Sequence, residues 1–213
     1  VDQWDWEKVI TREDRTLYYL KDVAQKIVNV ICDTSDLLKV DFPESAVSLS
    51  RNMVAITTAE LEDMYPTLSS KEREDAFLKE HKTALIMQIG GKLKSGKPHD
   101  GRAPDYDDWE LNGDIMFYNE LLGRAFEISS MGIRVDEKSL DRQLKERGCD
   151  DRRTLPFHSM LLRGELPLTI GGGIGQSRLC MLMMGRAHIG EVQSSIWDKE
   201  TIEKCREAGI KLL

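Results

Sequence analysis

Hydrophobic positions that recur at helical spacing divide much of the chain into helices. The clearest case is residues 17–31, where apolar side chains fall three or four positions apart. Thr11 and Asp14 precede this stretch with the spacing of a capping box, so we predict that the helix begins there. The same kind of pattern predicts further helices at 58–65, 70–81, 137–147, 157–164, 175–185 and 199–208.

Short apolar or alternating runs predict strands between these helices. The runs at 111–118 and 124–135 are separated only by "NELLG", which predicts an antiparallel hairpin. Hairpins between helices, without strict strand–helix alternation, favour an α+β fold in which an antiparallel β-sheet is flanked by helices. A long loop rich in glycine, proline and charge is predicted at 90–109. The other strands are predicted at 1–10, 46–50, 83–89, 166–170 and 188–197.

Composition and charge narrow the class of protein. The 213 residues suffice for one large domain or two small ones, and 40% of them are hydrophobic, as in ordinary globular proteins. The net charge of −7 disfavours a broad nucleic-acid surface, which needs a basic face. The four cysteines are single and widely spaced, which argues against a zinc ribbon or a disulfide scaffold and favours the cytoplasm. No apolar run is long enough to span a membrane.

A glycine-rich segment, "TIGGGIGQSRLCMLMMG" at 169–185, is the most unusual local pattern. It lacks the lysine of a Walker loop, and the spacing of Gly171, Gly173 and Gly175 departs from a dinucleotide-binding fingerprint. Glycines remove side chains, so a flat ligand can approach the backbone. Arg178 follows one turn into the predicted helix, where a guanidinium can stack on a base or hold a phosphate. A tight turn with Arg178 pointing to solvent is an equal alternative on these residues alone.

Two acidic residues lie inside apolar strands, where an unpaired charge is costly. If "NELLG" closes the hairpin, Asp114 either faces Glu127 directly or lies diagonal to it, about 4.5–8 Å away. At this distance the two carboxylates repel one another, and a hard cation between them would relieve the repulsion. We therefore predict a magnesium site at Asp114 and Glu127. The alternative is an exposed sheet face on which both are solvated.

Arg134 follows Glu127 on the second strand of this hairpin. The two residues are seven positions apart, so strict alternation would place their side chains on opposite faces. Gly132 lies between them, and a glycine inside a strand suggests a β-bulge, which would bring Arg134 to the face of Glu127. On that face Arg134 is a candidate clamp for a substrate carboxylate. Otherwise it is an ordinary surface arginine.

The alternating segment "VDQWDW" predicts two different faces on the first strand. Trp4 and Trp6 point to one face, which we expect to be core, whereas Gln3 and Asp5 face a cleft or solvent. A second acidic segment, "APDYDDW", contains Asp105, Asp107 and Asp108. Carboxylates suit an ammonium ligand, such as the α-amino group of an amino acid. A solvated acidic edge is the alternative, and for the second segment alone it is the preferred one.

Seven ordered motifs carry a resemblance to a known family. They are "VDQWDWE", "IGGKL", "RAPDYDDW", "LNGDI", "FEISSMGIRV", "LLRGELPLTIGGGIGQSR" and "HIGEVQSSIW". Together they resemble the ammonia-dependent aspartate–ammonia ligases, the bacterial-type asparagine synthetases, over nearly the whole chain. That family is itself similar to the catalytic domain of class II aminoacyl-tRNA synthetases, closest to the aspartyl and asparaginyl enzymes.

The resemblance implies a fold and a reaction. The fold would be the class II catalytic domain, with its antiparallel sheet flanked by helices, working as a homodimer. L-aspartate and ATP would form an aspartyl-adenylate and pyrophosphate, and ammonia would then displace AMP to give L-asparagine. The alternative is an adenylating enzyme like the aspartyl- or asparaginyl-tRNA synthetases, although the sequence shows no tRNA-binding module. We expect neither a nucleic acid nor a membrane as a partner.

The resemblance also implies roles for individual residues. Arg178 matches the arginine that lies against adenine, and Asp5 and Asp107 are candidates for the base that deprotonates ammonium. The amino-acid pocket would consist of Gln3, Asp5, Asp107, Ser130 and Arg134. ATP would be held, with Mg²⁺, by Asp114, Glu127, Gly173, Gly175 and Arg178.

The sequence departs from the family pattern in two places. "VDQWDWE" resembles the second strand of the family's motif 2, so we expect an N-terminal segment with the dimer motif and an α-phosphate arginine to precede it. Family members also have a longer loop between "DYDDW" and "LNGD", where Trp109 and Glu110 here run straight into Leu111. We expect one catalytic domain over 1–213 that lacks these two segments.

Overall fold

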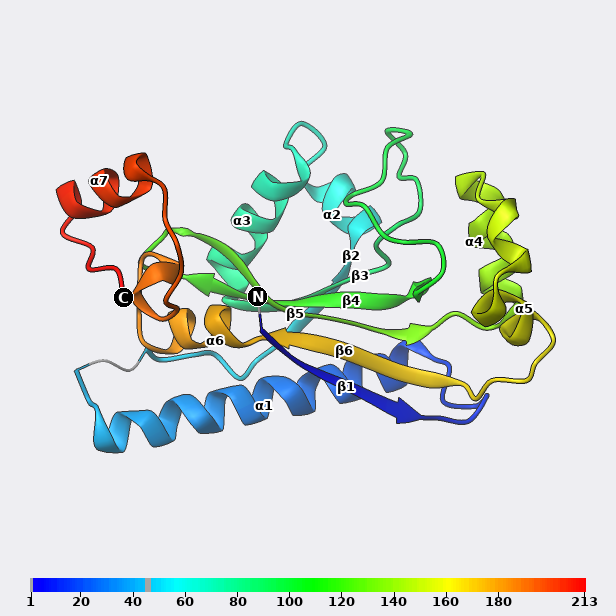
Figure 1. Ribbon diagram of the computed structural model, residues 1–213, viewed down its shortest axis with the longest axis horizontal. Helices are drawn as coiled ribbons and strands as arrows, with labels where there is room; N and C mark the ends of the chain where they lie inside the picture. The colour runs from blue at the N-terminus through cyan, green and yellow to red at the C-terminus, as the bar shows by residue number, and fades with distance from the viewer. Residues whose placement is uncertain (1, 45–46) are drawn as a thin grey trace.

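A computed structural model describes residues 2–44 and 47–213 and shows a six-stranded sheet with helices on both faces (Figure 1). Its strands are β1 (Gln3–Val9), β2 (Val54–Thr57), β3 (Thr83–Met87), β4 (Asp107–Asn119), β5 (Arg124–Arg134) and β6 (Thr169–Gly175), in the spatial order β1-β6-β5-β4-β3-β2. All neighbouring strands are antiparallel except β2 and β3, which are parallel. The sheet is therefore mixed, and the prediction of an antiparallel sheet is wrong at this edge. The helices α2 (Thr58–Met64) and α3 (Ser70–His81) form a crossover between β2 and β3, which returns the chain in the same direction.

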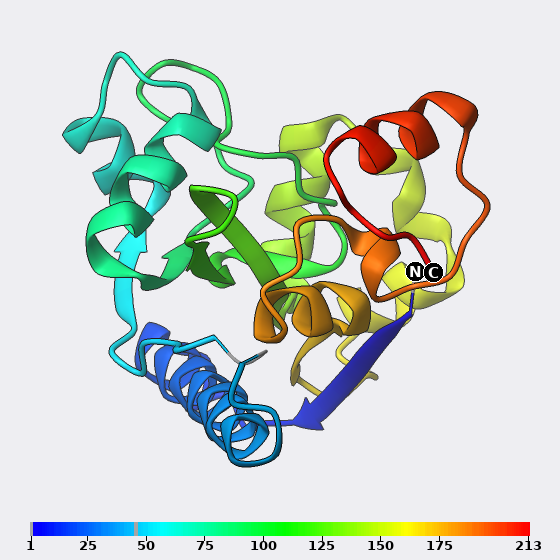
Figure 2. The ribbon, with the colours of Figure 1, turned by 90° about the vertical axis from the view of Figure 1, so that its left-hand side faces the viewer.

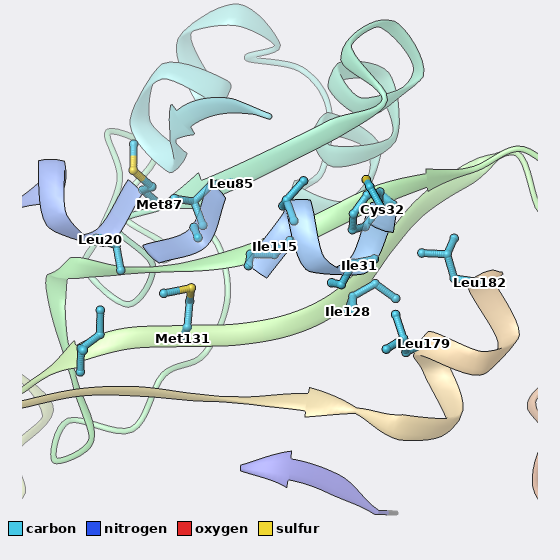
Figure 3. Close-up of a cluster of buried hydrophobic side chains, with 14 of the residues drawn as sticks. Leu20, Ile31, Cys32, Leu85, Met87, Ile115, Ile128, Met131, Leu179 and Leu182 are labelled. Carbon is cyan, nitrogen blue, oxygen red and sulfur yellow. The ribbon is translucent and has the colours of Figure 1, made fainter. Parts of the chain in front are cut away.

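One face of the sheet packs against the long helix α1 (Leu17–Asp41), and α6 (Gln176–Met183) joins the same core (Figure 1). Buried α1 side chains such as Leu20 and Ile31 lie against Leu85, Ile115 and Met131 of the sheet (Figure 3). The opposite face is covered by α2 and α3 at its β2–β4 end, where Ile86 and Met116 pack with Leu61, Phe77 and Leu78. The α+β class is therefore confirmed.

Two shorter helices, α4 (Glu137–Arg147) and α5 (Pro156–Leu162), form a separate small cluster beyond the end of β5 (Figures 1 and 2). Buried Val135, Leu140, Leu144 and Leu161 hold this cluster together. The last helix is α7 (Lys199–Glu207). Among residues 2–44 and 47–213, no helix combines the length and the apolar character needed to cross a bilayer.

The first helix begins later than predicted. Its N-cap is Thr16, whose side chain accepts a hydrogen bond from the backbone N–H of Tyr19. Thr11 instead donates to Asp14 from both its backbone N–H (2.9 Å) and its hydroxyl (3.1 Å), which closes a turn before the helix. Thr11 and Asp14 therefore interact as their spacing suggests, but they do so in the connection from β1 to α1 and not at the start of the helix.

Three predicted strands differ from the observed ones. In the segment 46–50, Ala46 lies outside the described residues and 47–50 are not in a strand, whereas β2 begins further on. In the segment 188–197 the chain forms a 3₁₀-helix (Ile189–Glu191), because the Glu191 carboxylate accepts the backbone N–H groups of Ala187 and His188. The strand predicted at 166–170 instead runs through the glycines as β6. The glycine run is therefore a strand, not a tight turn.

Candidate functional site

The candidate site is the polar face of β1, β6, β5 and β4, opposite α1. Side chains alternate along each strand, so the register between strands decides which residues become neighbours. From β1 to β4, one row consists of Asp5, Gly173, Ser130 and Asp114, and the next row consists of Glu7, Gly171, Gly132 and Asn112. The residues predicted for the site thus come from distant parts of the chain and lie on one surface.

Glycines form the floor of this surface because neighbouring polar side chains lie over them. A Cβ atom at Gly173 would lie 2.7 Å from Oδ1 of Asp5, and one at Gly132 would lie 2.6 Å from Cγ of Asp107. A Cβ atom at Gly171 would collide with Glu7 and with Arg134. The alternation of glycine in β6 therefore clears space on the site face of the sheet.

Asp114 and Glu127 are diagonal neighbours, as the second of the two predicted registers requires. Glu127 pairs with Met116, which lies two residues from Asp114 on the same face of β4. Asp114 is buried and only 5% exposed. The pKa of Asp114 is raised to about 6; burial is the largest cause and the charge of Glu127 adds to it, whereas Arg102 opposes both. The carboxylate of Glu127 is therefore close enough for its charge to act on Asp114.

Arg102 is a site residue that the sequence reasoning missed. Its guanidinium forms an ion pair with Asp114, and it comes from the loop between β3 and β4. Arg102 is the first residue of the motif "RAPDYDDW", and its place in that motif was the one sequence feature that could have indicated a role in the site. The backbone carbonyl of Arg102 accepts a hydrogen bond from Arg147 of α4 (3.4 Å), which ties the loop to the helix cluster.

Two carboxylates and an aromatic ring hold Arg134 in place. It forms ion pairs with Asp107 and with Glu7 (2.7 Å), and its guanidinium lies 4.0 Å from the centre of the Tyr106 ring. Burial raises the pKa of Asp107, although the charge of Arg134 opposes that effect. Glu7 is a second missed residue; its position on the face of Asp5, two residues along β1, was the available signal.

The bulge that brings Arg134 to this face is not at Gly132. Met116 pairs with Glu127 and Ile115 pairs with Ser129, so Ile128 is the extra residue. Gly132 instead leaves room for Asp107. The predicted consequence of a bulge is correct, whereas its predicted position is wrong, because Ile128 is an apolar core residue with no sequence mark of irregularity.

The acidic segment around Asp107 does not act as one group. Asp105 forms an ion pair with Arg152 and a hydrogen bond with Nε2 of His158, each at 2.8 Å, and Asp108 pairs with Arg15 at 2.8 Å. These contacts fasten the segment to α5, to the 3₁₀-helix Asp150–Thr154 that precedes α5, and to the connection that leads into α1. Of the three aspartates, only Asp107 joins the polar face beside Arg134.

Arg178 lies in the first turn of α6. It is beside Gly175, at the end of the glycine floor (Gly171, Gly173 and Gly175 of β6) that is opposite Arg134. Its Nη1 donates to the backbone carbonyl of Glu127 (3.1 Å) and lies 3.7 Å from the Glu127 carboxylate. Its guanidinium is 5.8 Å from the centre of the Phe126 ring, and the side chain is 48% exposed. Phe126, Glu127 and Arg178 also line a cavity of about 310 Å³. The arginine is thus directed toward Glu127, not simply into solvent.

The first strand is an edge strand, and its polar residues remain open. Gln3 and Asp5 are exposed on the site face, as the alternation predicts. Trp6 packs against the main core, but Trp4 is 52% exposed, so the expectation that both tryptophans are core is wrong for Trp4. The two indoles line a cavity of about 430 Å³ between β1 and α1, which explains the exposure.

The donors at Asp114 and Glu127 suit a hard divalent cation. Both are carboxylates on one face, and Oδ1 of Asp114 is buried without a hydrogen-bond partner among the described residues. Within residues 2–44 and 47–213, no group of three or more histidine, cysteine or acidic side chains is arranged to hold a metal. The protein therefore offers two carboxylate ligands, which is the number typical where substrate phosphates complete a magnesium shell.

Comparisons with known proteins agree on one family. The family model described as AsnA, aspartate-ammonia ligase, matches residues 1–209. An aspartate–ammonia ligase of Fusobacterium nucleatum is 57% identical over 213 residues, which is all of this chain and 65% of that protein. One from Lactobacillus johnsonii is 58% identical over 214 residues, again over the whole chain and 64% of the relative. The chain thus spans slightly less than two thirds of the length of these relatives.

Solved structures with a similar fold are aminoacyl-tRNA synthetases. An aspartyl-tRNA synthetase from Entamoeba histolytica has a TM-score of 0.59 at 19% identity, covering 89% of this chain and 41% of that one. An asparaginyl-tRNA synthetase from Pyrococcus horikoshii, complexed with asparaginyl-adenylate, has a TM-score of 0.58 at 15% identity, covering 87% and 44%. At these identities the likeness establishes the fold, which is that of the class II synthetase catalytic domains.

Proposed function

The chain belongs to the aspartate–ammonia ligase family, and we propose that it carries the site at which such an enzyme activates aspartate. The proposed reaction joins L-aspartate and ATP into an aspartyl-adenylate with release of pyrophosphate, and ammonia then displaces AMP to give L-asparagine. The observation that carries this proposal is the glycine floor. It has one arginine at each end: Arg134, which we assign to the substrate carboxylate, and Arg178, which we assign to the nucleotide.

The spacing along β6 supports two adjoining subsites. Gly171 lies beside Arg134 and Gly175 lies beside Arg178, and four residues of strand extend about 13 Å. Aspartate would lie at the Arg134 end, where its carboxylate meets the guanidinium. The nucleotide would lie at the Arg178 end, where the absence of side chains lets it approach the backbone of β6.

The α-amino group of aspartate would lie beside β1. Asp5 is exposed on the row that contains Ser130, and no ion pair engages it among the described residues. Gln3 lies one pleat further along the same face. We propose that Asp5, Gln3 and Ser130 bind the amino acid.

Asp107 has a different role from Asp5 in this proposal. It is buried and already paired with Arg134, so it positions the arginine that would hold the substrate carboxylate. Asp5 is therefore the preferred base for ammonium, which must lose a proton before its nitrogen can attack. The carboxylate is accessible and lies in the row of the proposed amino-acid pocket.

Asp114 and Glu127 would hold Mg²⁺, which supplies positive charge toward the phosphates when it is bound. Arg178 would contribute a second positive charge from α6. Its backbone contact to Glu127 fixes the position of the guanidinium relative to the carboxylate pair. We further propose one catalytic domain that works as a homodimer, because the chain resembles this family. We also propose that it lies in the cytoplasm, because its four cysteines are single and widely spaced.

The experiment that tests the proposal is aspartate-dependent exchange of labelled pyrophosphate into ATP, followed by product analysis with ammonia. We expect exchange without ammonia, and asparagine and AMP in equal amounts once ammonia is added. Formation of ADP, or a requirement for glutamine in place of ammonia, would contradict it.

A synthetase-like activity on tRNA is the second candidate, because the similar folds belong to tRNA synthetases. Both candidates make an adenylate, so pyrophosphate exchange does not separate them. Incubation with labelled aspartate and tRNA does: we expect no label in the tRNA fraction, and aminoacylated tRNA would favour this second candidate.

A further inference from the structure

The carboxylate pair that we assign to Mg²⁺ is already occupied by positive charge from the protein itself. Arg102 forms an ion pair with Asp114, and Arg178 lies 3.7 Å from Glu127. Each carboxylate thus has a guanidinium beside it. Two negative charges are matched by two positive charges before any ligand binds.

We propose that Arg102 acts as an internal cation at Asp114, which blocks metal binding until a phosphate-bearing ligand draws the guanidinium away. This inference rests on the proposed function, because it takes the carboxylate pair as the metal site and a nucleoside triphosphate as the phosphate ligand. Arg102 is then a positioning residue: it decides when Asp114 becomes available.

Burial makes this ion pair an effective block. The side chains of Arg102 and Asp114 are only 20% and 7% exposed, so water screens their charges poorly. A dication placed at Asp114 would stand within a few ångströms of the guanidinium, and both charges are positive. The metal and the inward position of Arg102 therefore exclude one another.

Unpaired polar atoms indicate that the inward arrangement is incomplete. Oδ1 of Asp114 and Nε of Arg102 are both buried without hydrogen-bond partners in the described part of the chain. A planar guanidinium can satisfy a carboxylate with two parallel hydrogen bonds, but here only one such bond forms. The guanidinium is thus held inward by one hydrogen bond to Asp114, so a competing ligand has less to displace than in a two-bond pair.

The origin of Arg102 explains how it can move. It belongs to the connection between β3 and β4, whereas Asp114 is fixed within β4. Phosphate oxygens attract guanidinium groups strongly, so an incoming triphosphate would compete with Asp114 for Arg102. The metal would take the released carboxylate, which couples nucleotide and metal binding.

The test measures Mn²⁺ binding to the nucleotide-free protein by electron paramagnetic resonance, which needs no catalytic turnover. We expect Arg102→Met to tighten Mn²⁺ binding at least about tenfold over the unaltered protein, because one opposing charge is removed. The double variant Arg102→Met/Asp114→Asn should lose that gain, which locates the bound ion at Asp114. Arg178→Met should tighten binding less, because Arg178 is more distant from its carboxylate and more exposed.

Arg142→Met is the matched control. It also removes one arginine charge, but its partners are Asp108 and Glu110, not Asp114. The proposal is overturned if folded Arg102→Met binds Mn²⁺ no more tightly than the unaltered protein, or if Arg142→Met tightens binding equally. Circular dichroism checks folding; if Arg102→Met does not fold, Arg102→Gln replaces it, and an Arg102→Gln protein that binds Mn²⁺ no more tightly than the unaltered protein overturns the proposal.

Pyrophosphate exchange keeps this inference separate from the proposed function. If the unaltered protein catalyses aspartate-dependent exchange but Arg102→Met shows no gain in Mn²⁺ affinity, only the internal-cation proposal fails. If the protein catalyses no such exchange, the proposed function fails, whatever the Mn²⁺ result.

Discussion

Arg134 shows how a single side chain is prepared to bind a carboxylate. An arginine side chain with no partners on a sheet would sample many rotamers. A ligand that holds it in one of them would therefore cost conformational entropy. Glu7 and Asp107 remove that freedom from two sides, and Tyr106 lies against the guanidinium. Because the arginine has five donor hydrogens, two carboxylates do not exhaust its capacity.

Glu7→Gln tests this positioning. We expect the KM for aspartate in pyrophosphate exchange to rise about tenfold while kcat changes little, because the amide holds Arg134 less tightly than the carboxylate does. Glu137→Gln is the matched control; it loses an ion pair to Arg12 at 2.9 Å, away from the polar face. An equal KM in the two variants would show that Glu7 does not position Arg134.

Individual residues were predictable where their chemistry conflicts with their surroundings. Asp114 and Glu127 drew attention because acidic residues interrupt apolar strands, and Arg178 because it follows a glycine run. Arg102 and Glu7 lie among other charged residues, so nothing local distinguishes them. Their importance comes from partners 12 and 127 positions away along the chain.

At the scale of elements, β6 is unusual because it is a strand built largely of glycine. Glycine weakens a strand, so its repeated use in β6 fits a surface that must stay free of side chains. Hydrogen bonding to both β1 and β5 compensates, since β6 lies between them in the sheet. The flat floor is thus held by its neighbours.

Gly173→Ala tests the floor. The added methyl group would lie 2.7 Å from Oδ1 of Asp5 and 3.2 Å from Oε1 of Gln3, so both side chains must shift. We expect kcat/KM for aspartate to fall at least about tenfold, with a change in melting temperature of only about a few degrees. At Gly91 an added Cβ meets nothing within 4 Å, so Gly91→Ala is the control. Equal activity in the two variants would contradict the account.

The start of α4 gives a pH-dependent prediction. Burial alone would raise the pKa of Asp136, but hydrogen bonds from Ser139 and Lys138 and the charge of Arg15 together lower it. A lowered folded-state pKa means that the carboxylate stabilises the native state above the unfolded-state value of about 3.9, and that this contribution is lost as the pH falls through the folded-state pKa.

Asp136→Asn isolates that contribution, because asparagine also caps helices but carries no charge. We expect the free energy of unfolding, measured with urea near neutral pH, to fall by about 1 kcal/mol. The difference between the two proteins should shrink as the pH falls below about 3.9, the unfolded-state value, and should be lost once the pH has passed the lower folded-state pKa of Asp136. A difference that stays constant across this range would assign the effect to something other than the charge.

The register between strands was predictable from the sequence only in part. The hairpin of β4 and β5 was predictable from "NELLG", and its register near the turn follows one of the two predicted alternatives. The extra residue Ile128 was not predictable, because an apolar residue suits a regular strand and a bulge equally. That one residue decides that Ser130 and Arg134 share a face with Glu127.

At the scale of the whole molecule, the fold class followed from the order of elements, but the parallel edge did not. Helical periodicity identified α2 and α3, yet periodicity carries no information on where a strand rejoins the sheet. The parallel pairing of β2 with β3 is determined by tertiary packing, in which Ile56, Leu61 and Phe77 form a cluster between β2 and its helices. The polar face lies away from this edge, so the error left the predicted site unaffected.

In the reaction that we propose for the whole enzyme, the carboxylate of aspartate is activated by transfer of AMP. In that reaction a carboxylate oxygen attacks the α-phosphorus of ATP and pyrophosphate leaves; ammonia then attacks the carbonyl carbon, and AMP departs with that oxygen. The polar face would suit this order, because Arg134 and Arg178 lie at opposite ends of one row of glycines in β6.

The most direct measurement follows the oxygen atom itself. Aspartate labelled with heavy oxygen in its side-chain carboxylate is converted with ATP and ammonia, and the products are separated and weighed by mass spectrometry. If AMP is transferred to aspartate, we expect one heavy oxygen atom in the phosphate of each AMP released with asparagine. Label in inorganic phosphate, or AMP without label, would contradict it.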